Sequence, residues 1–415
     1  MVTEAATLYS RPGLKIEKAI EYLTYGMILL FFTGKVFEVF TVLIDILFIT
    51  LLVIRKEKGF FQEHKREIIL FGVLFVYFIM QSMFATYSLK ALTNAVGMVR
   101  FVILMFALWY VFDSREKVKR LLYSIYGLIT ILFVDAAFQY GTGKDLFGYP
   151  LYQGYRLTLW YEMPKLSEKI SVFFGIVAAG LWITEKRKIA VLMMVLLTLM
   201  IVFAGNRGPV VYLIGSVFII FLLSEYRKYL PHLIVGTVLL LAAVFAVNPK
   251  MYEAFKYAYT NPLEAKYNAG RTPIYETAVL MIEDHPLLGI GSKNFTPEFH
   301  RYFQKIYDGR TTHDHYDEKY LTMPPSHTHS ILLSMLLNWG LIGMSLLLFI
   351  FYRMYQSYIG NNRLAILTLI GFVYAIAPFN FGKTVAHGQW QFFIFLSFTF
   401  ALIVANNYKE NRDVN

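Results

Sequence analysis

Two arginines, each close to a possible helix start, carry the first candidate chemistry. Arg207 lies in Ala204-Gly-Asn-Arg-Gly-Pro209, and Arg271 lies in Ala269-Gly-Arg-Thr-Pro273. Each stands two residues before a proline that is suited to the first position of a helix. The N–H groups at a helix N-terminus and a guanidinium fork together suit a phosphate. We predict that both arginines bind phosphate or pyrophosphate; the alternatives are an interfacial anchor for Arg207 and a loop ion pair for Arg271.

A histidine just before an apolar segment is the second candidate. His329 lies in Pro324-Pro-Ser-His-Thr-His-Ser330, where Thr328 or Ser326 can cap the helix that follows. The positive end of a helix disfavours a cationic imidazole, so we expect His329 to be neutral near pH 7 and able to act as a general base. A hydrogen-bonding role at the membrane interface is the alternative, and His327 is a second candidate two residues earlier.

The segment Thr312-His-Asp-His-Tyr-Asp-Glu318 has the side-chain types of a metal site. Its spacing matches no zinc pattern, so we interpret it as a solvated polar loop and predict no metal or other cofactor. The chain has no cysteine, which excludes disulfides and thiolate metal ligands.

A helix is expected to begin near Arg271, with Thr272 as its cap and Pro273 as its first residue. Apolar residues recur on one face, so we expect the helix to lie along the membrane surface; they are Ile274, Ala278, Met281 and Ile282. The following Gly289-Ile-Gly291 is too short for a phosphate loop and is predicted to end this helix.

Three ionisable residues fall inside apolar segments: Asp45, Arg100 and Asp135. Such residues are functional candidates in a membrane, although an Asp–Arg pair that joins two helices is an equal alternative. Arg100 is therefore a possible accessory residue. Arg156, which lies between apolar segments, is another possible accessory cation at an anion site.

The composition indicates a membrane protein. Hydrophobic residues make up 57% of the 415 residues and charged residues only 16%, against about 25% charged in soluble domains. Aromatic residues make up 17%, which suits lipid-facing surfaces and interfacial belts. Segments long enough to span a bilayer are about twenty residues. We predict an all-α polytopic protein with about twelve transmembrane helices, at about 19–34, 36–54, 68–84, 92–112, 121–140, 170–184, 189–204, 210–224, 232–248, 330–352, 364–379 and 389–406.

The basic residues predict the orientation of these helices. With both termini in the cytoplasm, the inside segments hold 21 Lys and Arg, whereas the short outside segments hold 8. The net charge of +11 is thus a topology signal, and we predict no nucleic-acid partner. We expect one integrated membrane domain: residues 1–247 with nine helices and a smaller outer loop at 141–169, a large outer loop at 248–329, and residues 330–415 with three helices and a cytoplasmic tail.

The order of these features resembles the O-antigen ligase and polymerase superfamily of bacterial envelope glycosyltransferases. The resemblance covers most of the chain. It rests on Gly205-Asn-Arg-Gly208, Gly270-Arg271, His285-Pro-Leu-Leu-Gly-Ile-Gly291 with Asn294-Phe295, the pair His327 and His329, and Asn338-Trp-Gly-Leu-Ile-Gly343. Family members often have asparagine after the second histidine, where this chain has Ser330.

The resemblance implies an inverting, metal-independent membrane glycosyltransferase of the GT-C type in the bacterial inner membrane. Its donor would be a glycan on undecaprenyl pyrophosphate, presented at the periplasmic face. By family pattern Arg207 and Arg271 would hold the pyrophosphate and His329 would activate the acceptor hydroxyl.

Several activities fit this resemblance. An O-antigen ligase, which transfers the glycan to lipid A–core in lipopolysaccharide biosynthesis, is favoured by the chain length and the single large loop. An O-antigen polymerase and a protein O-oligosaccharyltransferase are the enzyme alternatives. A polysaccharide transporter or flippase and a structural membrane protein are the alternatives outside enzymes, although the few charges in the spans count against transport.

Overall fold

The computed structural model describes residues 11–33, 35–223, 228, 230–250, 252–253, 256, 270–377 and 384–408. Residues 251, 254–255 and 257–269 of the predicted outer loop lie outside the described residues. So do four of the basic residues that entered the orientation count: Arg227, Lys383, Lys409 and Arg412.

Each of the twelve predicted spans overlaps one helix or a run of two or three consecutive helices, and the tenth, 330–352, is broken at the non-helical Gly340. In chain order these are α2 (Arg11–Leu29), α3 (Val36–Arg55), α5 (Lys65–Met83), α6 (Ser88–Val111), α7 (Arg115–Thr142), α8 (Leu166–Ile170) continued through η1 (Ser171–Phe173) into α9 (Phe174–Ile183), α10 (Arg187–Phe203), α11 (Arg207–Leu223), α12 (Leu230–Val247), α17 (Ile331–Met354), α18 (Arg363–Thr368) with α19 (Ile370–Ile376), and α20 (Gly388–Asn407). Within the described residues seven helical segments are long and apolar enough to cross a membrane, and shorter apolar helices accompany them. The predicted fold class, an all-α polytopic membrane protein, is confirmed.

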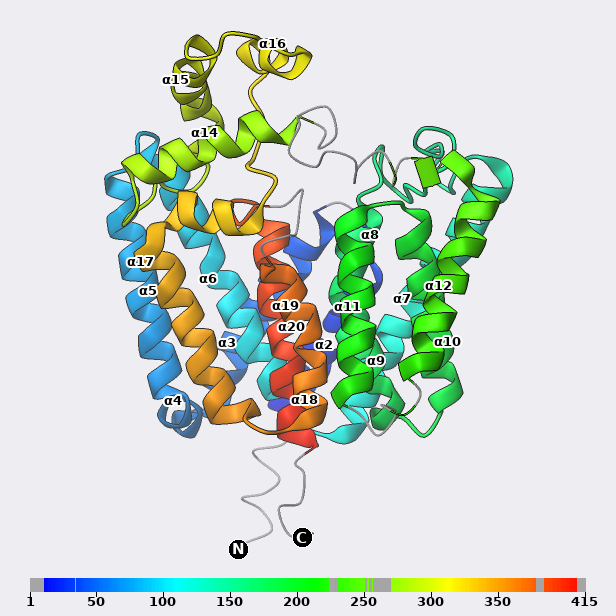
Figure 1. The fold of residues 1–415 in the computed structure, drawn as a ribbon. Coiled ribbons are helices and arrows are strands. Elements are labelled where there is room, and N and C mark those ends of the chain that lie inside the picture. The colour runs from blue at the N-terminus through cyan, green and yellow to red at the C-terminus, as the bar shows by residue number, and fades with distance from the viewer. Residues whose placement is uncertain are drawn as a thin grey trace, which may run out of the picture.

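Figure 1 shows the long helices side by side in one bundle. Three helices of the large loop, α14 (Arg271–Asp284), α15 (Phe295–Asp308) and α16 (His315–Thr322), cover one end of the bundle, and we call them the outer cap. The short helix α4 (Lys58–Glu63) lies at the opposite end. The outer cap lies within the loop, residues 248–329, that the sequence predicts to be outside.

The end of the bundle opposite the outer cap joins both ends of the described chain. Glu17 near the start of α2 binds Arg55 at the end of α3 and Lys117 at the start of α7, each at 2.5 Å. Arg115 donates to the carbonyl oxygen of Asn407, the last residue of α20, at 3.1 Å. The first and last described helices therefore reach the same end, as a chain with both termini on one side requires.

Many aromatic rings fill the interior of the bundle. Phe31 packs against Phe392 and Phe393 of α20, with ring centroids 5.4 and 4.8 Å apart. Phe351 of α17 packs against Phe398 of α20 at 4.7 Å, and all five rings are buried. The assignment of the aromatic excess to lipid-facing surfaces and interfacial belts is therefore only partly right. Large flat rings fill the gaps between helices, which smaller side chains would leave empty.

The outer cap has a hydrophobic core of its own. Ile274, Ala278 and Met281 of α14 are buried against α15 and against Leu337 of α17. The predicted apolar face of this helix thus exists, and protein side chains cover it. Figure 1 shows α14 lying across the end of the bundle, as a surface helix would.

Candidate active site

The turn before α11 places Arg207 at a helix N-terminus. The helix begins at Arg207 itself, two residues earlier than the predicted start at Pro209. Gly205 has a φ of +68°, a conformation that glycine adopts at little cost. The sharp turn lets the helix start before the proline, which occupies its third position. The guanidinium group therefore lies at a helix N-terminus, as predicted, but the helix begins two residues earlier than predicted.

Arg156 holds this turn in place. Its Nε donates to the carbonyl oxygen of Ala204 at 3.0 Å, and its Nη2 donates to the Oδ1 of Asn206 at 2.5 Å. The side-chain amide of Asn206 donates in turn to the hydroxyl of Ser167 at 3.0 Å. Burial lowers the pKa of the Arg156 guanidinium. At least two of the N–H donors of Arg156 are therefore bonded to the turn before α11. This geometry favours a role for Arg156 in positioning Arg207 over direct binding of an anion by Arg156.

The smaller outer loop is folded onto the top of α7. Asp135 accepts the backbone N–H of Leu146 at 2.9 Å and the indole N–H of Trp160 at 2.5 Å. Gln139, one turn later, donates to the hydroxyl of Thr158 at 2.6 Å. These bonds explain a buried carboxylate on a membrane-spanning helix, and they fix the loop that carries Arg156.

The N-terminus of α14 places Arg271 in the outer cap. The helix begins at Arg271, and Gly270 precedes it with a φ of +76°. Any side chain at position 270 would collide with the ring of Tyr316. The predictions of Thr272 as the cap and Pro273 as the first residue are therefore wrong. The ring of Tyr316 packs so closely that only glycine fits at position 270. Glycine adopts a positive φ at little cost, so the helix can begin directly after it.

Arg271 lies close to two tyrosines of the outer cap. Burial raises the pKa of Tyr275, and the positive charge of Arg271 acts on it in the opposite direction. The same charge also acts on Tyr320, whose pKa burial raises. The hydroxyl of Tyr275 donates to the carbonyl oxygen of His329 at 3.4 Å. Tyr275 thus links the arginine on α14 to the histidine before α17, a link that the sequence reading missed.

His329 occupies a constrained turn at the start of α17. Its φ is +53°, which non-glycine residues rarely adopt and which is typical of functional sites. Its ring lies against the ring of His327, with centroids 4.1 Å apart. His327 is itself hydrogen-bonded to the hydroxyl of Ser326 at 2.8 Å.

The cap of α17 is Ser330, whose hydroxyl accepts the N–H of Leu333 at 3.4 Å. Thr328 donates to the carbonyl oxygen of Ser330 at 2.9 Å. The prediction of Thr328 or Ser326 as the cap is therefore wrong. The helix begins directly after Ser330, so only this serine is one turn from the first free N–H groups. His329 thus lies immediately before a capped helix N-terminus.

Two glycine-containing motifs interlock beneath the outer cap. Residues 285–291 follow α14 directly, as predicted, and dock against a break in α17 at Gly340, where φ is +64°. The N–H of Leu341 donates to the carbonyl oxygen of Pro286 at 2.9 Å, and the N–H of Ile290 donates to that of Leu337 at 2.8 Å. The motif thus fixes the outer cap on the membrane domain.

Gly289→Ala is expected to lower the free energy of unfolding by about 3 kcal/mol. Its φ is +68°, and a methyl group there would lie 2.5 Å from the carbonyl oxygen of Leu337. Thermal unfolding of the purified protein in detergent measures the loss. Gly148→Ala is the matched control, because Gly148 also has a positive φ, +88°, but open space around it. Equal losses for the two variants would contradict the interlock.

Comparison with known families bears on these residues. Residues 192–348 match a family model described as O-antigen ligase. The matched segment contains Arg207, Arg271 and His329, whereas Arg156 precedes it. No curated protein matches the chain. The match supports the resemblance to the O-antigen ligase and polymerase superfamily, and with it a membrane enzyme of glycosyltransferase type.

The polar segment 312–318 makes its contacts within the outer cap. Asp314 caps α16 and accepts the N–H groups of Tyr316 and Asp317 at 2.8 and 2.9 Å. Asp317 is buried and forms an ion pair with Arg310. Within the described part of the chain, no group of three or more His, Cys, Asp or Glu side chains is placed to hold a metal ion. Residues 312–314 are exposed and non-helical, as the predicted solvated loop requires, whereas residues 315–318 begin a capped helix.

Arg100 lies at the interface of α3 and α6. Its guanidinium forms an ion pair with Glu38 of α3 at 3.6 Å. Asp45, a buried carboxyl on the same helix, lies close enough to Arg100 for an electrostatic interaction. The alternative of an Asp–Arg pair between helices is therefore close to what is found, with Glu38 as the bonded partner. The accessory role of Arg100 in the site stays a prediction.

Arg156→Met is expected to lower the transfer rate about 10²-fold, because the turn before Arg207 loses two hydrogen bonds and shifts. The loss should appear in kcat more than in KM, and Arg156→Lys should restore part of it through one bond. Steady-state kinetics on the purified protein measure both. Arg301→Met is the control, since Arg301 is exposed on α15 and pairs only locally with Glu298. A loss confined to thermal stability would contradict a positioning role.

Proposed function

We propose that the chain is an O-antigen ligase. It transfers a glycan from undecaprenyl pyrophosphate to a hydroxyl of lipid A–core at the periplasmic face of the inner membrane. The observation that carries the proposal is the match of residues 192–348 to the O-antigen ligase family, which includes all three proposed site residues. The hydrogen bond from Tyr275 to His329 supports it, because it joins the cap helix of Arg271 to the turn of the proposed base.

In the proposed reaction each residue has one task. Arg207 and Arg271 bind the pyrophosphate and neutralise the charge that grows as it leaves. His329 takes the proton from the acceptor hydroxyl. The hydroxyl oxygen forms a bond to the anomeric carbon while the bond to pyrophosphate breaks, and undecaprenyl pyrophosphate departs with the electron pair. Direct displacement inverts the anomeric centre.

This division of tasks follows from the chemistry of the two partners. A pyrophosphate neutralised by two guanidinium groups is a good leaving group, so the proposal includes no general acid and no metal ion. A sugar hydroxyl is a poor nucleophile and reacts faster when a base accepts its proton. A neutral histidine before a helix N-terminus suits that role, because the helix dipole disfavours its cationic form.

Deletion of the gene in a host that makes O-antigen tests the proposal. Loss of glycan on lipid A–core, with long lipid-linked chains still present, supports a ligase. Attachment of a single repeat unit to lipid A–core instead indicates a polymerase of the same superfamily. Unaltered lipopolysaccharide with unmodified proteins indicates a protein O-oligosaccharyltransferase. Complementation with the intact gene shows that the effect belongs to this chain.

A further inference from the structure

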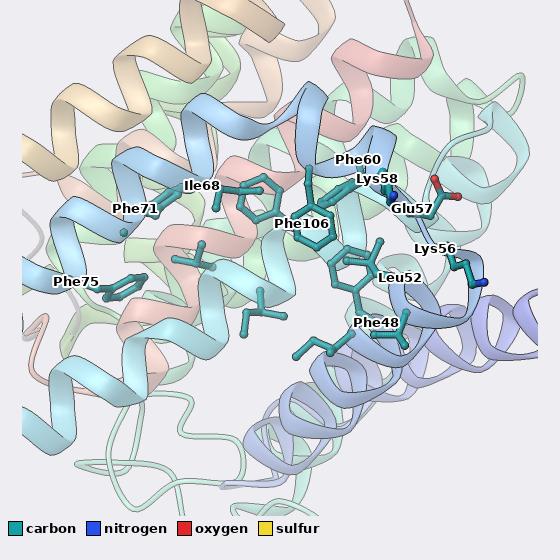
Figure 2. A pocket seen from close by; sticks show the side chains of 16 residues that line it. Phe48, Leu52, Lys56, Glu57, Lys58, Phe60, Ile68, Phe71, Phe75 and Phe106 are labelled. Carbon is teal, nitrogen blue, oxygen red and sulfur yellow. The ribbon is translucent and has the colours of Figure 1, made fainter.

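An apolar groove lies at the end of the bundle opposite the outer cap. It runs between α3, α5 and α6 beside α4, with a volume of about 540 Å³. Figure 2 shows that Phe71, Phe75 and Phe106 line its length and that Lys56 and Lys58 lie at one end. It is remote from Arg271 and His329, so it is not part of the proposed active site.

The groove is open where Gly72 lacks a side chain and where large apolar side chains face outward. A Cβ atom at Gly72 on α5 would meet no atom within 4 Å. Val53 is 70% exposed and Phe61 is 53% exposed, although both are large and apolar. In a protein that spans a membrane, such a surface contacts hydrocarbon. The groove therefore fits a hydrocarbon chain.

Two lysines and one glutamate line the end of the groove, which gives it a net positive charge. Lys56 and Lys58 are exposed, and neither joins an ion pair among the described residues. The carboxylate of Glu57 between them accepts the hydroxyl of Tyr110 at 2.9 Å, and Tyr110 accepts from Arg55 at 2.9 Å. Glu57 is thus bonded into the protein, and the two lysines remain available to an anion.

We propose that the groove binds one acyl chain of an anionic phospholipid, whose phosphate contacts Lys56 and Lys58. Basic side chains next to a membrane attract anionic lipids, and this end of the bundle is the one that the basic residues predict to be cytoplasmic. The apolar groove matches the acyl chain of such a lipid, and the two lysines match its anionic head group. A bound lipid stabilises the folded protein by mass action and joins α3 to α5 across the open side of the groove.

Native mass spectrometry of the purified protein tests the proposal. The probes are phosphatidylglycerol and phosphatidylcholine with identical acyl chains, added to delipidated protein in detergent. Phosphatidylglycerol is expected to bind more tightly. The double variant Lys56→Gln with Lys58→Gln is expected to weaken phosphatidylglycerol about 25-fold, from about fivefold for each lysine, and to leave phosphatidylcholine unchanged.

Gly72→Phe fills the groove and is expected to abolish the tight binding of phosphatidylglycerol. Gly215→Phe is the matched control, since Gly215 on α11 is also in open space but far from the groove. Thermal unfolding without lipid shows that both variants fold. Equal affinity for the two lipids, or tight binding that survives in Gly72→Phe, would overturn the proposal. So would occupation of the groove by a polyprenyl lipid or a second copy of the chain in preference to phosphatidylglycerol.

Discussion

His329→Asn is expected to lower the rate of glycan transfer by about 10²–10⁴-fold, the range that general-base catalysis contributes. Asparagine is the informative replacement, because it tolerates the left-handed backbone of residue 329 better than alanine does. The loss of rate then reports the imidazole and not a disturbed turn. Transfer from a lipid-linked donor to purified lipid A–core in detergent, followed by gel electrophoresis, measures the rate.

Two further histidine variants make the result specific. His313→Asn is the control, because His313 stacks on the ring of Tyr307 in the outer cap at a centroid distance of 3.7 Å. It is expected to transfer glycan at the normal rate. His327→Asn tests the neighbouring ring, and it is expected to lower the rate of glycan transfer only modestly. If His327→Asn is inactive and His329→Asn is active, the proposed base is the wrong histidine.

Arg207→Gln and Arg271→Gln are each expected to lower kcat by about 10²–10³-fold, as loss of one donor to a developing anion does. Lysine replacements are expected to recover only part of the rate, since an ammonium lacks the bidentate fork of a guanidinium. Kinetics with varied donor concentration separate binding from the chemical step. An increase in KM with unchanged kcat would place the arginines in substrate binding alone.

The double variant shows whether the two arginines act on the same group. If both contact one pyrophosphate, the combined loss should differ from the product of the single losses. Arg187→Gln is the control: Arg187 is also the first residue of a helix, α10, but lies at the other end of the bundle. A similar loss in this variant would point to a general effect of charge removal, and purely multiplicative losses would place Arg207 and Arg271 at separate sites.

The membrane fold was predictable from the sequence because hydropathy is a local property. Whether some twenty residues cross a bilayer depends on their own side chains, so each predicted span falls on a helix. The apolar face of α14, with Ile274 and Met281, was predictable for the same reason. Helix starts were less accurate: α11 and α14 begin at Arg207 and Arg271, not at the prolines. The turns at Gly205 and Gly270 set where these two helices begin. The residues that pack against the turns are distant in the sequence, so the local sequence pattern does not reveal them.

The sequence by itself determined the all-helical membrane architecture, the two arginines near helix starts and the histidine before α17. Only the tertiary structure showed which distant residues position them. Arg156 binds the turn of Arg207 across 50 residues of chain, and Tyr275 reaches His329 across 54. Spacing along one chain cannot reveal such contacts. They depend on how separate helices and loops pack; the interlock of residues 285–291 with the break at Gly340, for example, holds the outer cap on α17.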